Sequence, residues 1–340
     1  MIQSCCVVSR ICETELPYIN SFISHYVSLG FDNIYFVNHK ISQYQAVVNY
    51  INKHPHANIC TVIPVKIRKG FRTNKLQNFA ISHINDKFDY VLGVDCDEYL
   101  QLDQKYSDIK QYVQRHSSYR AHHFMWCYMV SDSDGKINCC MRDKWQGGRV
   151  KSMIKLTNGT LRAIPIHGAV PLHKYIRSKN NVYGGILPNM GKGKVKFFEE
   201  EARLYHYWGR SFNDFVLKST EQSGLAVGNK NLGGVAGLER HIRDNILPAR
   251  FVGLANFNLF KIHDELLPRN EYMAIDTQLE YQQIQDRVSE VTYNNIKNMY
   301  QVYKEYITNN PPGLKHPYNV PGPKSKGKKF TGPVSLDTLT

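Results

Sequence analysis

The sequence lacks the features that would assign it at once to a membrane or exported protein. Its 340 residues contain no run of about 18 uninterrupted apolar residues, the length that a membrane-spanning helix needs. The N-terminal stretch MIQSCCVVSR has neither the charged start nor the long apolar middle of a secretory signal. With 42% hydrophobic residues, the chain can bury a large core. We therefore expect a globular protein that neither spans a membrane nor is evidently exported.

The cysteines also lack the spacing of a metal site. The eight cysteines include two adjacent pairs, Cys5-Cys6 and Cys139-Cys140, but no C-x-x-C. Disulfide frameworks are typical of small secreted domains, not of a chain of this length. We therefore expect reduced, mostly buried thiols and a cytoplasmic location.

Acidic residues are few, and the imbalance indicates an anionic partner. There are 29 Asp and Glu against 43 Lys and Arg, which gives a net charge of +14. Nucleic acid, a membrane surface and phosphorylated substrates all fit this charge. Part of the excess lies in the Pro-, Gly- and Lys-rich tail at 311–340, which we predict to be flexible. Peripheral association with the cytoplasmic face of a membrane is therefore one of our expectations.

Runs typical of strands alternate with helical patterns in the N-terminal part. The strand-like runs lie at 3–9, 31–38, 58–65 and 89–95, and the stretches of helical spacing lie at 13–30, 42–54 and 73–88. The strands are apolar throughout instead of at every second residue. This predicts an α/β fold with a mostly parallel sheet and helices on both faces.

Further along the chain, helical patterns are again dominant between 211 and 307. We accordingly divide the chain into a first domain at 1–225, a mainly helical C-terminal region at 226–310 and the tail. In open parallel sheets, ligands bind at the edge formed by the carboxyl ends of the strands. The first domain is therefore the expected place of a ligand site.

Three carboxylates follow the last predicted strand of this alternation. The segment YVLGVDCDEYL ends in Asp95, Asp97 and Glu98. Residues i and i+2 of an extended segment point the same way, so Asp95 and Asp97 would present two oxygen ligands to one cation. Hard oxygen ligands fit Mg²⁺ or Mn²⁺, which commonly bridge a carboxylate to substrate phosphates. The alternative is a solvated acidic turn after a strand.

Several segments resemble those of glycosyltransferases with the GT-A fold, in particular the family 2-like and family 92-like group. One is the D-x-D-E segment VLGVDCDEYL, and another is the opening stretch VVSRICETELPYINSFISHYVSLGFDNIYFVNH. A third is RLYHYWGRSFNDFVLKSTEQSG, and weaker matches are KSMIKL and IPIHGAV. Together they extend over roughly residues 3 to 225, and their order is what makes the resemblance specific.

This resemblance implies a GT-A domain that transfers a sugar from a nucleotide diphosphate sugar, with a UDP-sugar as the first candidate donor. The acceptor would be a hydroxyl of a glycan, polysaccharide or lipid-linked molecule, and the reaction would invert the anomeric centre. Mn²⁺ or Mg²⁺ would be held by Asp95, Asp97 and His206 and would stabilise the leaving diphosphate. For His206, packing within an aromatic cluster is the alternative.

The resemblance also implies positions that would contact the nucleotide. Glu15 matches the acidic residue of the family's opening loop, with Glu13 as a competitor, and Asn38 follows the second strand. We expect Asp95 to contact the nucleotide as well as the metal ion. Two cations would meet phosphate near the start of a helix, or else lie on the solvated surface: Arg72 and Lys75.

An inverting transferase needs a carboxylate that takes the acceptor proton. Asp143, beside the aromatic and Gly-rich KWQGGR, is our choice of catalytic base. The sequence also offers Asp132, Asp134 and the run at 199–201, which is most simply a solvated turn. His167 in IPIHGAV is either a packed histidine or part of the site.

Two other functions compete with this interpretation. The first is nucleic-acid binding, suggested by the charge. No RNP aromatic motif or zinc finger is present, so we expect no nucleic-acid partner. The second is a metal-dependent hydrolase of sugar nucleotides on the same fold, in which water replaces the acceptor and free sugar is the product.

Overall fold

The computed structural model describes most of the N-terminal part of the chain and selected segments beyond it. The described residues are 3–66, 73–118, 121–131, 137–142, 150–156, 181–184, 196–197, 201–222, 238, 242 and 274–309. Two compact units interleave along the sequence. The first is Met1–Cys127, Asp143–His206 and Asp264–Thr277, and the second is Tyr128–Arg142, Tyr207–His263 and Gln278–Thr340. The domain limits at 225 and 310 stay predictions, and the tail lies outside the described residues.

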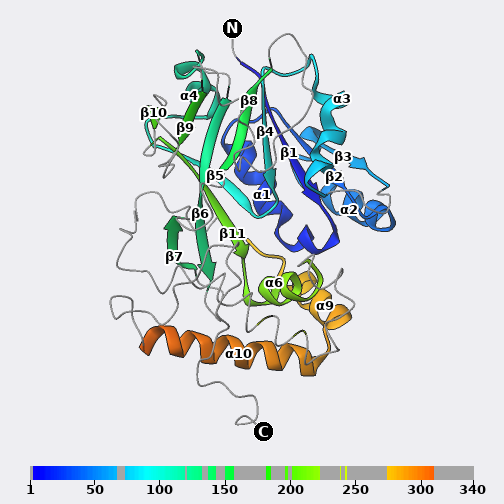
Figure 1. Ribbon diagram of the computed structural model, residues 1–340. Helices are drawn as coiled ribbons and strands as arrows, with labels where there is room; N and C mark the ends of the chain where they lie inside the picture. The colour runs from blue at the N-terminus through cyan, green and yellow to red at the C-terminus, as the bar shows by residue number, and fades with distance from the viewer. Residues whose placement is uncertain are drawn as a thin grey trace. The chain divides into compact units, whose positions relative to one another are not determined.

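Four parallel strands form the N-terminal part of the sheet in the first unit (Figure 1). They are β1 (Cys5–Ile11), β2 (Asn33–Asn38), β3 (Cys60–Pro64) and β4 (Tyr90–Asp95). β1 lies between β2 and β4, and β3 follows β2. Most of their apolar side chains are buried whichever face they point to, as in parallel strands covered by helices. The expected α/β fold is confirmed.

Beyond β4 the sheet continues with strands of both directions. β8 (Val150–Lys155) is antiparallel to β4, and next in order come β6 (Ala121–Ser131), β9 (Asn181–Gly184) and β10 (Lys196–Phe197). β6 is antiparallel to β8, whereas β9 and β10 are parallel to their neighbours. β7 (Ile137–Arg142) pairs with β6. An antiparallel pair, β5 (Glu98–Leu102) and β11 (Ala202–Gly209), lies off this path and carries His206.

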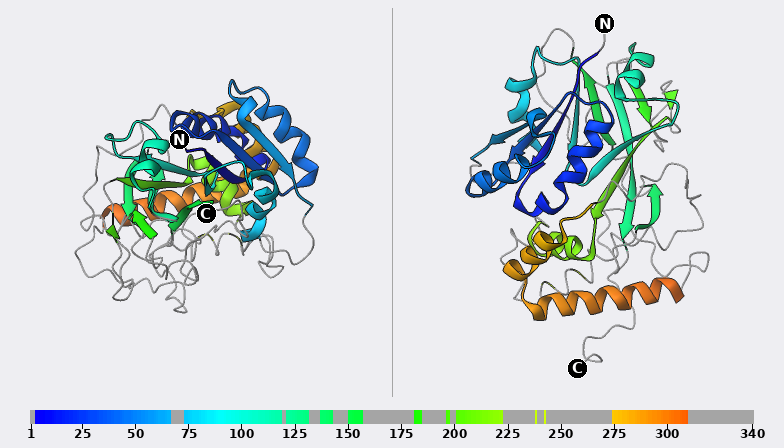
Figure 2. Two further views of the ribbon diagram at one scale, coloured as in Figure 1. Left: turned by 90° about the horizontal axis from the view of Figure 1, so that it is seen from above. Right: turned by 180° about the vertical axis from the view of Figure 1, so that it is seen from behind.

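Helices cover both faces of the parallel strands (Figure 2). On one face lie α1 (Leu16–Ser28) and α2 (Tyr44–Ile51), and the ring centroid of Phe22 in α1 is 5.9 Å from that of Phe36 in β2. On the other face, the 3₁₀ helix η4 (Thr73–Ala80) and α3 (Ile81–Ile84) pack against β1 and β2. The shorter connecting elements are η1 (Glu13–Glu15), η2 (Ile41–Gln43), η3 (Ala57–Ile59) and α4 (Ile109–Arg115).

The helix predicted at 73–88 is largely 3₁₀ and ends early. Only Ile81–Ile84 is α-helical, after eight residues of 3₁₀ helix. Asp86 has a φ of 63°, in the left-handed region that asparagine and aspartate tolerate better than most residues. The helix ends at Ile84 because Asn85, with ψ 136°, already leaves the helical region, and the conformation of Asp86 does not allow the helix to resume.

Helices dominate the described residues of the second unit, which confirms the expected helical C-terminal region. They are α6 (Phe212–Leu217), the π-helical η5 (Lys218–Gln222), α9 (Thr277–Arg287) and α10 (Glu290–Asn309). The Ser211 side chain accepts from the backbone N–H of Asp214 and caps α6. Phe212 and Phe215 pack with Ile284 and Tyr300 in one apolar cluster. None of the helices that the structure describes combines the length and the apolarity needed to cross a lipid bilayer.

Cysteines behave as expected where the structure describes their side chains. Five thiols are free, and all of them except the half-buried Cys60 are buried: Cys5, Cys6, Cys12, Cys60 and Cys96. Burial raises the pKa of Cys5 to about 12, so that thiol stays protonated and unreactive. The cytoplasmic location stays a prediction.

Stability should fall in mild acid because His25 is buried in the neutral form. His25 is 1% exposed and donates from Nε2 to the Leu100 carbonyl at 2.8 Å, and burial lowers its pKa from 6.5 to about 4. Between these pH values the unfolded chain binds the extra proton, so unfolding becomes easier as the pH drops. We expect the His25 contribution to fall by about 3 kcal/mol between pH 6.5 and 4, measured by urea unfolding.

The comparison uses two glutamine variants. His25→Gln should flatten the pH slope in this window. The control variant, His56→Gln, replaces an exposed histidine and should change the slope much less. A wild-type slope in His25→Gln would contradict the assignment.

Candidate active site

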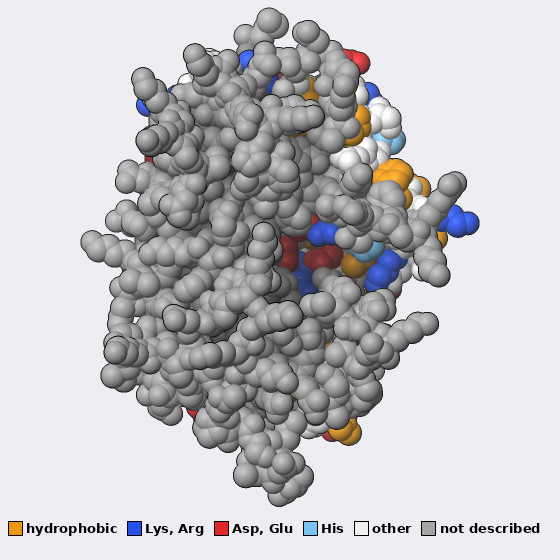
Figure 3. Space-filling model, viewed as in Figure 1, with side chains coloured by type: hydrophobic (Ala, Val, Ile, Leu, Met, Phe, Trp, Pro, Cys, Tyr) orange, Lys and Arg blue, Asp and Glu red, His pale blue; other side chains and the backbone are white. Residues whose placement is uncertain are grey.

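The carboxyl edge of the parallel strands brings polar residues of three strands together. In the register of β1 and β4, Arg10 lies opposite Asp95, and in that of β1 and β2, Ile11 lies opposite Asn38. β1 runs two residues further than the sequence pattern predicts, and this extension carries Arg10 to the edge. Acidic and basic side chains are visible next to one another near the centre of the face in Figure 3.

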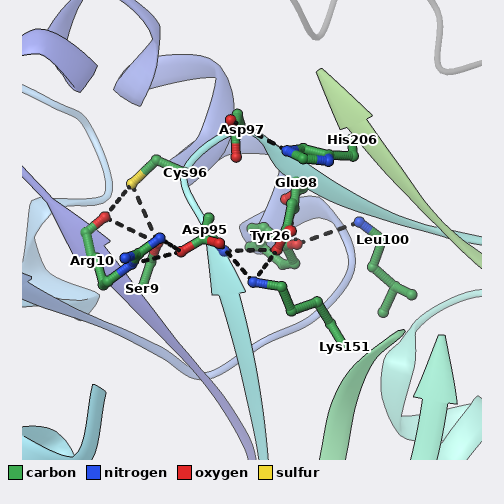
Figure 4. Close-up of polar contacts among 10 residues, drawn as sticks. All are labelled: Ser9, Arg10, Tyr26, Asp95, Cys96, Asp97, Glu98, Leu100, Lys151 and His206. Atoms are coloured by element: carbon green, nitrogen blue, oxygen red, sulfur yellow. Dashed lines mark hydrogen bonds and ion pairs between the residues drawn. The ribbon is translucent and has the colours of Figure 1, made fainter. Parts of the chain in front are cut away.

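Asp95 at the end of β4 is shared by two cations (Figure 4). Its Oδ1 accepts from Arg10 Nε at 2.8 Å and lies 2.6 Å from Arg10 Nη2, while Oδ2 accepts from Lys151 Nζ at 2.6 Å. Lys151, on β8, is fully buried. Burial alone would raise the pKa of Asp95, but Arg10 and Lys151 overcome it and hold that pKa well below its ordinary value.

The chain turns immediately after Asp95, and the turn separates the two aspartates of the D-x-D segment. Cys96 and Asp97 form this turn, so the extended geometry expected for the segment is absent. Asp97 lies beside His206, with 3.5 Å between Asp97 Oδ2 and His206 Nε2. Two of the three predicted metal ligands, Asp97 and His206, therefore lie together. The third, Asp95, instead forms ion pairs with Arg10 and Lys151.

Glu98, the first residue of β5, has one oxygen bound and one without a hydrogen-bond partner. Oε2 accepts from the backbone N–H of Asp95 at 2.8 Å and lies 3.0 Å from Lys151 Nζ. Oε1 is buried and has no hydrogen-bond partner among the described residues. Burial raises the pKa of Glu98 to about 8 even though Lys151 opposes this shift. A buried oxygen without a partner is costly unless something binds it.

Three side chains at this point have the composition of a metal site. One ligand atom each from Asp97, Glu98 and His206 lies within 4.8 Å of the others, and all three residues are buried. The pairing of β5 with β11 places Glu98 opposite His206, so the cluster is built into the sheet register. Two carboxylates and an imidazole suit a divalent ion such as Mn²⁺. The residues present thus fit the metal that the sequence implies, with Glu98 in the place expected for Asp95.

Helix α1 fixes the strand that carries Glu98. The Tyr26 hydroxyl donates to the Glu98 carbonyl at 2.8 Å and accepts from the Leu100 N–H at 3.3 Å. His25, the preceding residue, donates to the Leu100 carbonyl. On the other side of the turn, the Cys96 thiol donates to the Arg10 carbonyl at 2.9 Å. Both ends of the short turn are therefore attached to neighbouring elements.

The residues predicted to contact a nucleotide fall into two groups. Glu15 is 9% exposed in η1, and Asn38 is fully buried at the end of β2. The buried Oδ1 of Asn38 has no hydrogen-bond partner among the described residues. Arg72 lies outside the described residues, and of Lys75 only the backbone, in η4, is described. Their contacts with a nucleotide stay predictions.

The carboxylates considered for the catalytic base are mostly outside the described residues. These are Asp132, Asp134, Asp143, Glu199 and Glu200, and the same holds for His167. Glu201 is described, and the expectation of a solvated turn is wrong for it. It is 7% exposed and accepts from Lys105 at 2.6 Å, Tyr106 at 2.8 Å and His116 at 2.7 Å. These donors hold a buried carboxylate, which explains why Glu201 can lie in the interior.

Sequence reasoning missed the roles of Arg10 and Lys151. Each is a charged residue within a short apolar run, CCVVSRI and VKSMIK. A charge in such a run indicates a strand end or a buried ion pair. This signal is present in the sequence. That the partner of both cations is Asp95, however, becomes evident only once β1 and β8 are known to lie beside β4.

Comparisons with known proteins give low similarity throughout. No protein-family model and no curated protein sequence matches this chain. Residues 1–349 of TarS from S. aureus match at 14% identity, with 89% of this chain and 92% of that chain covered and a TM-score of 0.35. A 4-diphosphocytidyl-2C-methyl-D-erythritol synthase from Anaerococcus prevotii matches at 8% identity, with 46% and 72% covered and a TM-score of 0.28. The mannosyltransferase Ktr4p from S. cerevisiae, in complex with GDP, matches at 11% identity, with 38% and 41% covered and a TM-score of 0.26.

At TM-scores this low, the fold assignment rests on the strand order and register of the chain itself.

Replacing Tyr26 should loosen the strand that carries Glu98. Tyr26→Phe removes one hydroxyl that makes two buried hydrogen bonds to β5, and leaves the Glu98 carbonyl and the Leu100 N–H without this partner. We expect a loss of about 1–3 kcal/mol in the free energy of unfolding, measured in urea. Tyr281→Phe is the matched control, because Tyr281 is 59% exposed and its change should stay within about 0.5 kcal/mol. Equal effects of the two variants would refute this role of Tyr26.

Proposed function

We propose that this protein is a metal-assisted glycosyltransferase that moves a sugar from a nucleotide diphosphate sugar to an acceptor hydroxyl. The observation that carries the proposal is the cluster of Asp97, Glu98 and His206 beside the carboxyl edge of a parallel sheet. That edge is where open α/β sheets bind their ligands. The buried Oε1 of Glu98, which has no hydrogen-bond partner in the described part of the chain, supports a cation as its partner.

Charge supports the same conclusion. With a cation bound, Glu98 would be ionised despite its raised pKa, and the three negative charges of Asp95, Asp97 and Glu98 would face the two positive charges of Arg10 and Lys151. A divalent cation at the cluster would turn this excess of one negative charge into an excess of one positive charge. The edge would then attract an anionic diphosphate instead of repelling it.

The roles of the residues follow from their positions. Asp97, His206 and Glu98 would hold Mn²⁺ or Mg²⁺, which when bound supplies Lewis-acid stabilisation of negative charge on the leaving diphosphate. Asp95 keeps Arg10 and Lys151 in place at the edge. Asn38 and Glu15 remain our candidates for the nucleoside.

The remaining assignments rest on the sequence. Arg72 and Lys75 are proposed to meet phosphate, and Asp143 is proposed as the base that takes the acceptor proton in an inverting reaction. We propose a UDP-sugar as donor and a glycan or lipid-linked acceptor. A cytoplasmic protein with peripheral membrane association fits the basic tail.

A thermal-shift screen tests the donor class. UDP-, GDP-, CMP- and dTDP-sugars are each added with and without Mn²⁺. A ligand that binds only the folded protein raises its melting temperature by mass action. We expect a UDP-sugar to raise it, and to do so more when Mn²⁺ is present. If no sugar nucleotide shifts the transition under either condition, the proposal fails.

Asp97→Ala should abolish transfer while the protein stays folded. The substitution removes one metal ligand and relieves crowding of negative charge, so folding should be retained. Mn²⁺-dependent transfer should fall more than about 100-fold. This exceeds the 10- to 100-fold loss that is typical when a residue that only orients a metal ligand is replaced. The measurement is transfer of labelled sugar from the donor found in the screen, with products separated.

Asp286→Asn is the control, because Asp286 is exposed on α9 and should leave turnover unchanged. Near wild-type turnover in Asp97→Ala would remove the metal role. Release of free sugar with every acceptor supplied would instead identify a hydrolase.

A further inference from the structure

Lys151 is a buried cation that touches two carboxylates at once. Its side chain has no exposed surface, and its Nζ lies 2.6 Å from Asp95 Oδ2 and 3.0 Å from Glu98 Oε2. Burial would lower the pKa of Lys151, but Asp95 and Glu98 reverse this and raise it. A buried ammonium is costly unless its partners are well placed, so these contacts determine where the two carboxylates can lie.

The contacts of Lys151 fix the orientation of Glu98. Its ammonium and the Asp95 N–H both bind Oε2 of Glu98, from different elements of the sheet. With Oε2 held twice, the carboxylate cannot rotate freely, and Oε1 is the oxygen left for the cluster with Asp97 and His206. Arg10 holds the other oxygen of Asp95 and so stabilises the same arrangement from β1.

We propose that Lys151 is a positioning residue, which directs Oε1 of Glu98 toward the metal site through its bond to Oε2. The proposal rests on the metal site of the proposed function. It adds that the site is set up before any ion binds, by a cation on β8 that itself does not contact the ion. Preorganised ligands bind a cation more tightly because less order has to be created on binding.

The first experiment measures Mn²⁺ affinity of the full chain by isothermal titration calorimetry, without any sugar nucleotide. Lys151→Met keeps an unbranched side chain one atom shorter and removes the charge. We expect Mn²⁺ to bind about 10- to 100-fold more weakly than in the wild type, the range typical of residues that orient metal ligands. Lys155→Met is the matched control on the same strand. Its ammonium donates to the Ser117 carbonyl at 2.9 Å, so Mn²⁺ affinity should not change.

A double-mutant cycle separates positioning from a general loss of structure. If Lys151 acts through Glu98, then Glu98→Gln and Glu98→Gln combined with Lys151→Met should bind Mn²⁺ equally weakly. A further loss in the double variant would overturn the proposal. The double variant also removes the charge of Glu98, one of the two carboxylates that Lys151→Met leaves without its cation, so the comparison of Glu98→Gln with the double variant remains informative if the single Lys151 variant does not fold.

The wild type and the variants report on different claims. Absence of Mn²⁺ binding to the wild type would overturn both the proposed function and the role of Lys151. Tight binding to the wild type and equally tight binding to folded Lys151→Met would overturn only the role of Lys151.

Discussion

A buried ion-pair network at the sheet edge is the interaction on which the candidate site depends. Arg10, Asp95, Lys151 and Glu98 alternate in charge and come from β1, β4, β8 and β5 in turn. Burying these charges separately would cost several kcal/mol for each ion, and the alternation offsets that cost. The network therefore makes the relative positions of four strands interdependent, and a small displacement of any one of them leaves a charge without its partner.

The turn after β4 gives the acidic residues of one short segment different roles. Asp95 ends β4 and completes the ion-pair network, whereas Asp97 lies in the turn and reaches His206 on β11. Glu98 is the first residue of β5. Its Oε2 belongs to the ion-pair network, and its Oε1 is the oxygen left for the cluster with Asp97 and His206. Tyr26 and the Cys96 thiol hold the two sides of the turn, so its geometry is determined by α1 and β1 as well as by its own residues.

Much of this could be predicted from local sequence, because apolar strands and amphipathic helices are local patterns. The parallel sheet and the helices on both of its faces follow from such patterns, whereas the association of Asp97 with His206 was implied only by the family resemblance. The position of Lys151 does not follow from local patterns, because it requires β8 to enter the sheet antiparallel beside β4, a long-range pairing that the segment VKSMIK does not encode alone. The prediction of Asp95 as a metal ligand requires an extended segment, and a two-residue turn is enough to change which carboxylates converge.

A carboxylate shared by two cations is not by itself the mark of a ligand site. In the second unit, Asp214 accepts from Arg210 at 2.9 Å and lies 3.3 Å from Lys218, and these cations stand four residues before and after it along the chain. That arrangement is explained by the spacing of residues around α6 and by burial of all three side chains. At the sheet edge, in contrast, the network ends in a carboxylate oxygen that no described donor satisfies, beside an aspartate and a histidine. The physical difference is this unsatisfied oxygen, because a closed ion-pair network needs no further partner and an open one does.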